Sequence, residues 1–275
     1  MRRVSGGDEM TDAFARCRSE AAAAFGDGAL FLERLLTRPR HIEVQVLADA
    51  SGNVVHLFER DCSVQQRHQK VLEIAPAPNL PETLRRRLLD DAVALVREAG
   101  YVNAGTVEFL VEPESGEHFF IECNPRIQVE HTITEQVMGV DLVEAQLRIA
   151  AGASLADLGL ADQDAIAAPR RFAVQARVVA RGAGTLSGYK EPSGPGVRVD
   201  ACGYPGYTPP PQFDPLLAKS SARPAPWAWR GRRHADRLPR RPRPDAAGSE
   251  RFHRRAAHQP GRAARHPRPS SRARR

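Results

Sequence analysis

The chain has 275 residues, 41% of them hydrophobic, and a formal net charge of +7, so it is long enough for two modest globular domains. No apolar run reaches the length of a membrane-spanning helix, and no signal-peptide core follows the basic N-terminus, which argues against a membrane protein. The four cysteines lack the paired spacing of a disulfide framework or a zinc site, so we expect a reduced, cytoplasmic protein.

The positive charge is confined to the end of the chain. Residues 223–275 contain 17 arginines and 3 acidic residues, a net charge of +14, whereas the preceding 222 residues carry 23 basic and 30 acidic residues, a net charge of −7. A basic tail could bind nucleic acid through phosphate contacts. Because it shows no repeat, no amphipathic period and few aromatic residues, we interpret residues 223–275 as a disordered Arg/Pro-rich segment and do not expect nucleic-acid binding.

The first third of the chain predicts a helix and three strands. Ser5 or Asp8 can cap a helix that runs to about Phe25, and the apolar run 29–36 predicts a buried strand. Residues 41–47 alternate between apolar side chains and the polar Glu43 and Gln45, as in a strand.

A turn then leads into a returning strand over residues 54–59, and residues 60–70 are expected to form a polar loop. Residues 81–99 predict a helix with Pro81 near its start and Gly100 just past its end.

A second hairpin is predicted from strands 106–111 and 118–124. An amphipathic helix follows over residues 141–151. Its predicted inward-facing residues are Leu142, Val143, Leu147 and Ile149. Short strands at 172–180 and 196–200 then indicate a smaller, mainly β unit, so the fold class is α+β.

The predicted second hairpin carries candidate metal ligands. The period of two along a strand puts Glu122 and Asn124 on one face, and Glu108 on the partner strand can face them. Two carboxylates and an amide oxygen suit a hard divalent cation that keeps phosphate oxygens as its other ligands. A polar, solvated hairpin face is the alternative, although Glu108 lies within an apolar strand where burial is expected.

Three further stretches could bind a substrate. Beyond Pro125, an arginine could hold a small planar anion whose proton a nearby carboxylate takes, although a surface ion-pair loop would look the same. The basic and amide side chains of residues 61–70 suit phosphate or ribose, but solvated loops often have this composition. Residues 31–36 could read an adenine edge, although a buried strand fits them better. His41 and His56 read as structural rather than catalytic.

Four motifs together resemble biotin carboxylase, the ATP-grasp subunit or domain of pyruvate, acyl-CoA and urea carboxylases. They read HIEVQVL at residues 41–47, ERDCS at 59–63, RHQK at 67–70 and NPRIQVEH at 124–131. Carbamoyl-phosphate synthetase shares the style of residues 122–126 but is not expected to continue as residues 127–131 do. The resemblance runs from the N-terminus to about Lys219.

The resemblance implies the C-terminal half of an ATP-grasp fold over residues 1–160, incomplete at its N-terminus. A partial β-rich biotin carboxylase C-terminal domain follows over 168–222, and then the tail. The implied activity is ATP-dependent carboxylation of biotin by bicarbonate, with Mg²⁺ or Mn²⁺ and a carrier-bound biotin. The implied partners are a biotin carboxyl carrier, a carboxyltransferase component and, in the intact family, further copies of the chain.

The resemblance also assigns roles to individual residues. Glu130, Arg126 and Arg177 would be catalytic, with Glu130 as the base and Arg177 stabilising the biotin enolate or carboxyphosphate. Bicarbonate would be bound by Arg126, Gln128 and Val129. ATP would be contacted by Glu33, Leu36, His41, Gln65, His68 and Lys70. The metal ligands would be Glu108, Glu122 and Asn124.

This sequence also departs from the family pattern. The glycine-rich phosphate loop expected before Met1 is absent from it, and the match stops at Ser220, as a frame-shifted reading of GC-rich coding sequence would produce. We therefore expect impaired activity from this chain alone. The alternative is a non-catalytic fragment that binds a carboxylase partner or, through its tail, nucleic acid.

Overall fold

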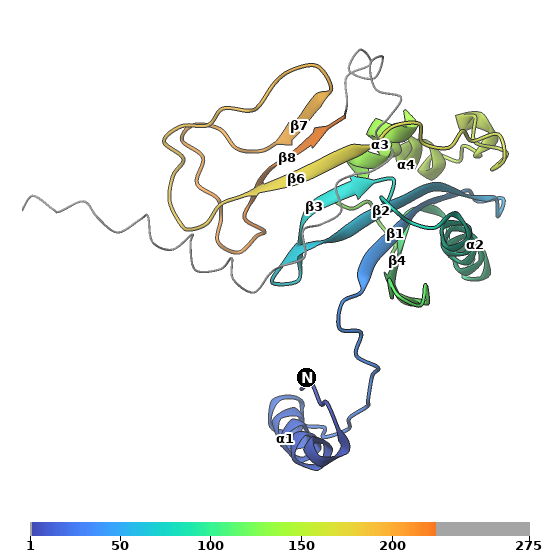
Figure 1. Ribbon diagram of the computed structural model, residues 1–275. Coiled ribbons are helices and arrows are strands. Elements are labelled where there is room, and N and C mark those ends of the chain that lie inside the picture. The colour runs from blue at the N-terminus through green and yellow to red at the C-terminus, as the bar shows by residue number, and fades with distance from the viewer. Residues whose placement is uncertain (1, 224–275) are drawn as a thin grey trace, which may run out of the picture. The chain divides into compact units, whose positions relative to one another are not determined.

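The computed structural model describes residues 2–223, which contain an α+β fold (Figure 1). The helices are α1 (Gly7–Phe25), α2 (Glu82–Glu98), α3 (His131–Met138), α4 (Leu142–Ala150) and a 3₁₀ turn, η1 (Ala156–Leu158). The strands are β1 (Arg40–Ala48), β2 (Val54–Gln66), β3 (Gln69–Ala75), β4 (Asn103–Val111), β5 (His118–Asn124), β6 (Ala173–Val179), β7 (Val197–Ala201) and β8 (Leu216–Ala222). None of the helices within 2–223 combines the length and apolarity needed to cross a bilayer. Of the tail predicted to be disordered, residues 224–275 lie outside the described residues.

All eight strands belong to one antiparallel sheet, in the order β5-β4-β1-β2-β3-β6-β8-β7. The predicted hairpin of β4 and β5 is confirmed, and its register sets Glu108 opposite Glu122. Strand β6 pairs with β3, so the C-terminal strands extend the sheet of the preceding residues. This pairing brings residues 173–176 beside residues 72–75, about a hundred positions away in the chain.

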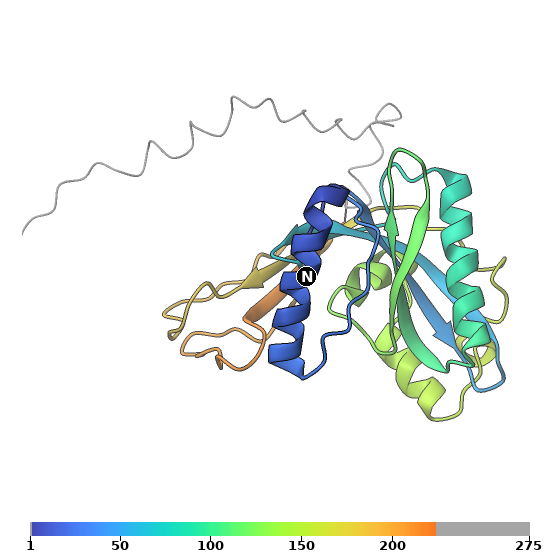
Figure 2. The ribbon, with the colours of Figure 1, turned by 90° about the horizontal axis from the view of Figure 1, so that it is seen from below.

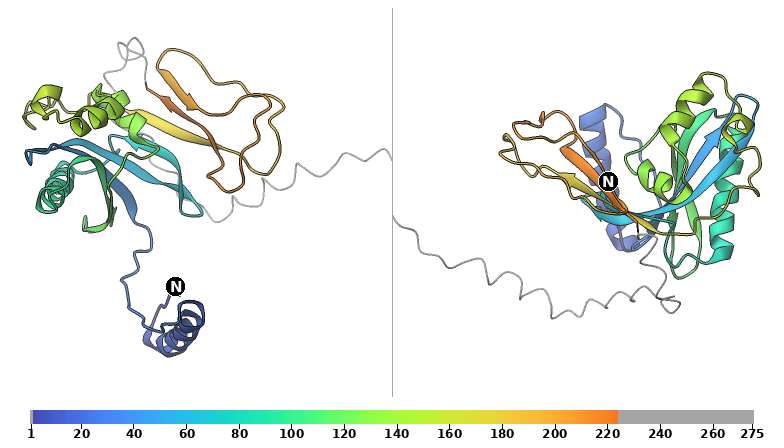
Figure 3. Two further views of the ribbon diagram at one scale, coloured as in Figure 1. Left: turned by 180° about the vertical axis from the view of Figure 1, so that it is seen from behind. Right: turned by 90° about the horizontal axis from the view of Figure 1, so that it is seen from above.

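Helices cover both faces of the central strands. The first core cluster joins one face of β1 and β4 to α2, through residues such as Val44, Leu88 and Phe109. The second joins the opposite face to α4, through Leu47 and Leu142. Figures 2 and 3 show strands β1, β2 and β4 between α2 and α4. The predicted alternation along β1 is therefore confirmed, but both of its faces are buried.

Two predictions about local structure are wrong. Residues 29–36 form no strand, and Phe31 and Leu32 are exposed, because this segment pairs with no strand of the sheet. The expected polar loop 60–70 is instead the hairpin of β2 and β3, which turns at Arg67 and His68, both with positive φ. The polar side chains of this hairpin contact β1 and the loop after β5, as described below, and these contacts stabilise its two strands.

Helices differ from expectation in detail. The first helix is confirmed, but its N-cap is Gly6, with no side-chain cap from Ser5 or Asp8. Helix α3 was not predicted. Helix α4 was predicted, and it buries Leu142 and Ile149 as expected. However, its other buried residue is Ala145, whereas Val143 and Leu147 are exposed, because the side that faces the sheet is narrower than the hydrophobic pattern suggested.

Candidate active site

A cavity of about 420 Å³ opens between the β2–β3 hairpin, the β4–β5 hairpin, the loop before α3 and the end of β6. Twelve of the fourteen predicted site residues line it. They are His41, Gln65, His68, Lys70, Glu108, Glu122, Asn124, Arg126, Gln128, Val129, Glu130 and Arg177. His41 and Arg177 are far apart in the sequence, but the sheet order places β6 next to the β2–β3 hairpin, so both side chains reach the cavity.

The predicted metal ligands lie on adjacent strands at the cavity wall. Glu108 of β4 is directly opposite Glu122 of β5, and the Asn124 side-chain nitrogen donates to Glu108 at 3.0 Å and to Glu122 at 3.1 Å. Carboxylate and amide oxygens are the ligands that Mg²⁺ or Mn²⁺ takes beside phosphate oxygens, so the donor types fit. The amide of Asn124 would have to turn its oxygen inward to join them.

The carboxylate of Glu108 is buried and surrounded by nitrogen donors. His41 Nε2 lies 2.5 Å from it, Lys70 Nζ 3.0 Å and Gln128 Nε2 2.7 Å. Burial alone would raise the pKa of Glu108, but the hydrogen bond from His41 and the charge of Lys70 outweigh burial and lower it to about 2. Glu108 is therefore ionised at neutral pH, as a metal ligand must be.

Lys70 stands at the centre of three carboxylates. Its Nζ donates to Glu43 at 2.5 Å, to Glu108 at 3.0 Å and to Glu130 at 2.6 Å. Burial opposes its charge, but the three carboxylates raise the pKa of Lys70 above its ordinary value. Lys70 thus fixes a positive charge in the cavity wall where a phosphate oxygen could be held.

Two groups of side chains in residues 2–223 have the close spacing of metal ligands. One consists of His41, Glu43 and Glu108, and the other of Glu43, Cys62 and Glu130. In both groups the Lys70 ammonium contacts the two carboxylates, so it already supplies the positive charge there. The exposed Glu122 makes the hairpin face the more accessible place for an ion.

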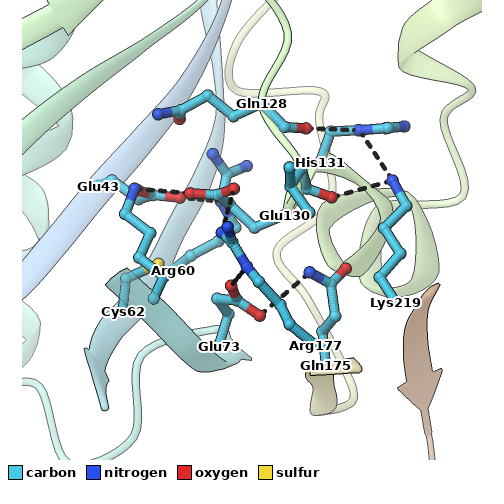
Figure 4. A network of polar contacts seen from close by, with 12 residues as sticks. Glu43, Arg60, Cys62, Glu73, Gln128, Glu130, His131, Gln175, Arg177 and Lys219 are labelled. Atoms are coloured by element: carbon cyan, nitrogen blue, oxygen red, sulfur yellow. Dashed lines mark hydrogen bonds and ion pairs between the residues drawn. The ribbon is translucent and has the colours of Figure 1, made fainter. Parts of the chain in front are cut away.

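Glu130 is held between two cations. The Glu130 side chain is 2% exposed, and one of its oxygens lies 2.6 Å from Lys70 Nζ. The other oxygen lies 3.0 Å from Arg177 Nη2, and Figure 4 shows this pair. Arg177 in turn donates from Nε to the buried Glu73 at 2.7 Å. Burial raises the pKa of Glu73 even though the guanidinium of Arg177 opposes that rise.

The loop between β5 and α3 offers unpaired backbone donors. Among residues 2–223, the amides of Val129 and Glu130 have no acceptor, while both residues line the cavity. Arg126 is exposed beside them, and its Nη2 donates to the Asn124 side-chain oxygen at 3.1 Å. Free amides next to a guanidinium are donors that a small anion requires.

Only some of the residues that the sequence predicts to contact ATP lie at the cavity. His41, Gln65 and His68 lie at the cavity, and the Gln65 side-chain nitrogen is 3.0 Å from His41 Nδ1. Glu33 and Leu36 lie outside it, on the extended segment 29–36. Their roles stay predictions.

Sequence reasoning missed the side chains that support the cavity from below. Glu43 and Gln45 are completely buried, and so is Arg60, whose Nε lies 2.5 Å from Glu43. Burial disfavours the charge of Glu43, but Arg60 and Lys70 lower its pKa overall. The signal for this contact was the polar side of the β1 pattern, which carries Glu43 and Gln45 within an otherwise apolar strand.

Residues 1–158 match the family model for the carbamoyl-phosphate synthase L chain, ATP binding domain. The chain is 49% identical over 242 residues to pyruvate carboxylase of Schizosaccharomyces pombe, an alignment that covers 85% of this chain and 20% of the relative. It is 53% identical over 228 residues to pyruvate carboxylase 1 of Caenorhabditis elegans, covering 80% and 19%. The chain therefore spans about a fifth of the length of these relatives.

Solved structures of biotin carboxylases are similar over most of the described residues. One is the biotin carboxylase domain of a thermophilic 2-oxoglutarate carboxylase bound to bicarbonate, with a TM-score of 0.75, 40% identity, and coverage of 81% of this chain and 51% of that one. Another is a complex of Campylobacter jejuni biotin carboxylase with β-γ-ATP, with a TM-score of 0.71, 37% identity, and coverage of 82% and 50%.

Proposed function

Because the chain belongs to the family of carbamoyl-phosphate synthase L chain ATP-binding domains and is homologous to biotin carboxylase domains, we propose that it serves ATP-dependent carboxylation of biotin by bicarbonate. The observation that carries this proposal is the convergence of twelve predicted site residues on one cavity, with Glu130 between Lys70 and Arg177. Two similar structures, one bound to bicarbonate and one in complex with β-γ-ATP, support it.

In the proposed reaction, bicarbonate binds at Arg126, Gln128 and the free amide of Val129, and Glu130 accepts its proton. A bicarbonate oxygen then attacks the γ-phosphorus of ATP, and the bond to ADP breaks, which gives carboxyphosphate. Carboxyphosphate divides into CO₂ and phosphate, the released phosphate takes the N–H proton of biotin's ureido group, and that nitrogen then forms its bond to CO₂. Arg177 stabilises the negative charge that develops on biotin or on carboxyphosphate.

The nucleotide phosphates would lie along Lys70 and His68, with His41 and Gln65 towards the ribose. Glu108, Glu122 and Asn124 would hold Mg²⁺ or Mn²⁺, which when bound would neutralise charge on the phosphates. The ionised state of Glu108 and the hard oxygen donors of the hairpin fit such an ion.

We expect the activity of this chain alone to be low. Glu33 and Leu36 lie away from the cavity, and the apolar residues beside them are exposed, with Phe31 at 81%. The proposed partners are a biotin carboxyl carrier, a carboxyltransferase component and further copies of the chain. Efficient turnover would require that one of them covers this segment. A cytoplasmic location is part of the same proposal.

The test is ADP formation by the purified full chain, measured with and without bicarbonate and free biotin. We expect a slow rate that needs both, and we expect Glu130→Gln to lower it by about 10²-fold or more, because the general base is lost. Glu114→Gln is the matched control, since the Glu114 side chain is 90% exposed on the β4–β5 turn. A rate that Glu130→Gln leaves unchanged would contradict the proposal.

The second candidate is a non-catalytic role in which the chain binds a carboxylase partner. The exposed apolar segment around Phe31 is the observation that favours it. A chain that binds bicarbonate and ATP but forms no ADP under any of these conditions would support this second role.

A further inference from the structure

Two cations on neighbouring strands reach the same loop. Arg177 of β6 is directly opposite Lys219 of β8 in the ladder. Arg177 contacts the Glu130 side chain at 3.0 Å (Figure 4), and the Lys219 Nζ donates to the carbonyl oxygen of Val129 at 2.9 Å. One strand pair therefore holds both the side chain of Glu130 and the peptide that precedes it.

The stability of the strand pair does not explain the position of Lys219. Like charges directly opposite each other in a ladder destabilise the strand pair. The nearby carboxylates are taken by another cation, because Arg198 lies 2.5 Å from Glu135 and 2.9 Å from Asp200. Burial lowers the pKa of Lys219, Asp200 opposes that shift and Arg198 adds to it. A half-buried ammonium whose closest partner is a single backbone carbonyl needs another explanation.

His131 gives a second view of the same contact. Its Nδ1 lies 2.7 Å from the Gln128 carbonyl oxygen, so Nδ1 carries the hydrogen and donates it. The Lys219 Nζ is 3.4 Å from that nitrogen and cannot donate to it. Burial lowers the pKa of His131, and the charges of Lys219 and Arg60 lower it further, while Glu135, 3.8 Å from Nε2, acts in the opposite direction.

The Val129 carbonyl belongs to the same peptide as the free amide of Glu130. An ammonium on that carbonyl fixes the plane of the peptide and polarises it, so that the amide becomes a stronger donor. Lys219 thereby acts on a group that faces the cavity without lining the cavity itself.

We propose that Lys219 is a positioning residue for residues 128–131, where it fixes the Val129–Glu130 peptide and lies against the imidazole of His131. The part that concerns bicarbonate rests on the proposed function, whereas the order of the loop and the state of His131 do not. Nothing in the sequence motif around Lys219 indicated this role.

The experiment uses the full chain with ¹³C-labelled histidine and ¹⁵N-labelled backbone. Three variants are compared with the wild type: Lys219→Met, which removes the ammonium, Lys219→Arg, which keeps a cation, and Lys190→Met as a control. Lys190 is exposed, so its loss changes the net charge equally without touching the loop. NMR then measures the titration of His131 and hydrogen exchange of the hydrogen-bonded amides of His131 and Ile133. It also measures the shifts of the free Val129 and Glu130 amides with added sodium bicarbonate, against sodium chloride.

In Lys219→Met we expect the pKa of His131 to rise by about one unit or more, because a neighbouring positive charge is removed. We expect exchange of the His131 and Ile133 amides to become about tenfold faster and bicarbonate to bind about tenfold more weakly, as for the loss of one charge-assisted hydrogen bond. Lys219→Arg should recover most of these changes, and Lys190→Met should show none.

Unchanged exchange and an unchanged His131 titration in Lys219→Met would overturn the proposal. Loss of the folded state in both Lys219 variants would also overturn it, because Lys219 would then stabilise the sheet as a whole. If the wild type showed no bicarbonate shifts, the proposed function would lose its anion site. Faster loop exchange in Lys219→Met would still support the positioning role in that case, and equal exchange would overturn it.

Discussion

At the scale of single residues, Arg60 joins four elements of the fold beneath the cavity. Its guanidinium is fully buried and donates to Glu43 at 2.5 Å, to Gln45 and Thr134 at 2.8 Å and to Thr106 at 3.3 Å. Burying a charge of this kind costs several kcal/mol, in general, and the cost is offset only when every donor has a partner. Arg60 therefore holds Glu43 in place, and Glu43 in turn holds Lys70.

A second chain of contacts supports Arg177 in the same way. Thr132 at the start of α3 donates to the Gln175 side-chain oxygen at 2.6 Å, and the Gln175 nitrogen donates to Glu73 at 3.1 Å. Glu73 then accepts from Arg177 Nε. The start of α3 and the guanidinium that faces Glu130 are thus connected through buried side chains.

His56 gives a prediction about stability and pH. His56 belongs to β2 and is 9% exposed. Burial lowers its pKa to about 4, and the charge of Asp90 opposes this shift. A histidine that titrates near 6.5 when unfolded then favours the folded state above that pH, and this stability is lost as the pH falls from about 6.5 towards 4. We expect the free energy of unfolding to fall by about 2 kcal/mol on this account between about pH 7 and pH 5.

The measurement is urea unfolding at both pH values for the wild type, His56→Gln and His68→Gln. His56→Gln should lose that part of the pH dependence, whereas His68→Gln should keep it because His68 is exposed. Other groups, such as His131, titrate equally in all three chains. Parallel pH curves for the wild type and His56→Gln would contradict the assignment.

At the scale of elements, local patterns predicted the fold where the pattern and the packing agree. The alternation of residues 41–47 gave β1, and the proline and glycine around residues 82–98 gave the bounds of α2. The hairpin of β4 and β5 was predicted together with the approach of Glu108 to Glu122.

The prediction failed where distant residues decide the structure. The polar residues 60–70 form strands because Arg60 and Lys70 find carboxylates on β1 and β4. The first turn of helix α3 contains Thr132, Ile133 and Thr134, which are weak helix formers, and all three are buried. Such contacts span tens of residues and have no local signature. The motif resemblance, rather than periodicity, brought Arg177 into the candidate site.

Gly196 gives a prediction about the β7–β8 pair. Its φ is +81°, and a Cβ there would lie 2.4 Å from the Arg223 carbonyl oxygen, while its own carbonyl accepts from the Arg223 amide at 3.0 Å. Gly196→Ala should therefore lower the free energy of unfolding by about 1–3 kcal/mol, because both the left-handed backbone and the close approach are lost.

Urea unfolding and hydrogen exchange of the β7 amides measure this effect. Gly188→Ala is the control, since a Cβ at Gly188 meets nothing within 4 Å and its φ is not positive. The two variants should differ in both readouts. Equal stability of Gly196→Ala and Gly188→Ala would show that the close approach to Arg223 does not limit the pair.

At the scale of the whole molecule, the chain combines charges of opposite sign with exposed apolar side chains. The first 222 residues are acidic and residues 223–275 are strongly basic. Within residues 2–223, the segment before β1 carries three exposed apolar side chains close together, Phe31 at 81%, Leu32 at 72% and Leu35 at 54%. Burying each such side chain would contribute roughly 1.5–3 kcal/mol, which the chain does not gain in this form.

Contiguous exposed apolar residues favour association, so the double variant Phe31→Ser/Leu32→Ser should reduce self-association of the full chain. Sedimentation velocity at several protein concentrations measures it, and the unfolding temperature should stay within a few degrees because neither side chain is buried. Leu147→Ser is the matched control, since Leu147 is 66% exposed on α4, in a different element. If the double variant associated as the wild type does, or if Leu147→Ser reduced association equally, this segment would not be the adhesive surface. The exposure of apolar side chains in residues 29–36 would then not explain how the chain associates.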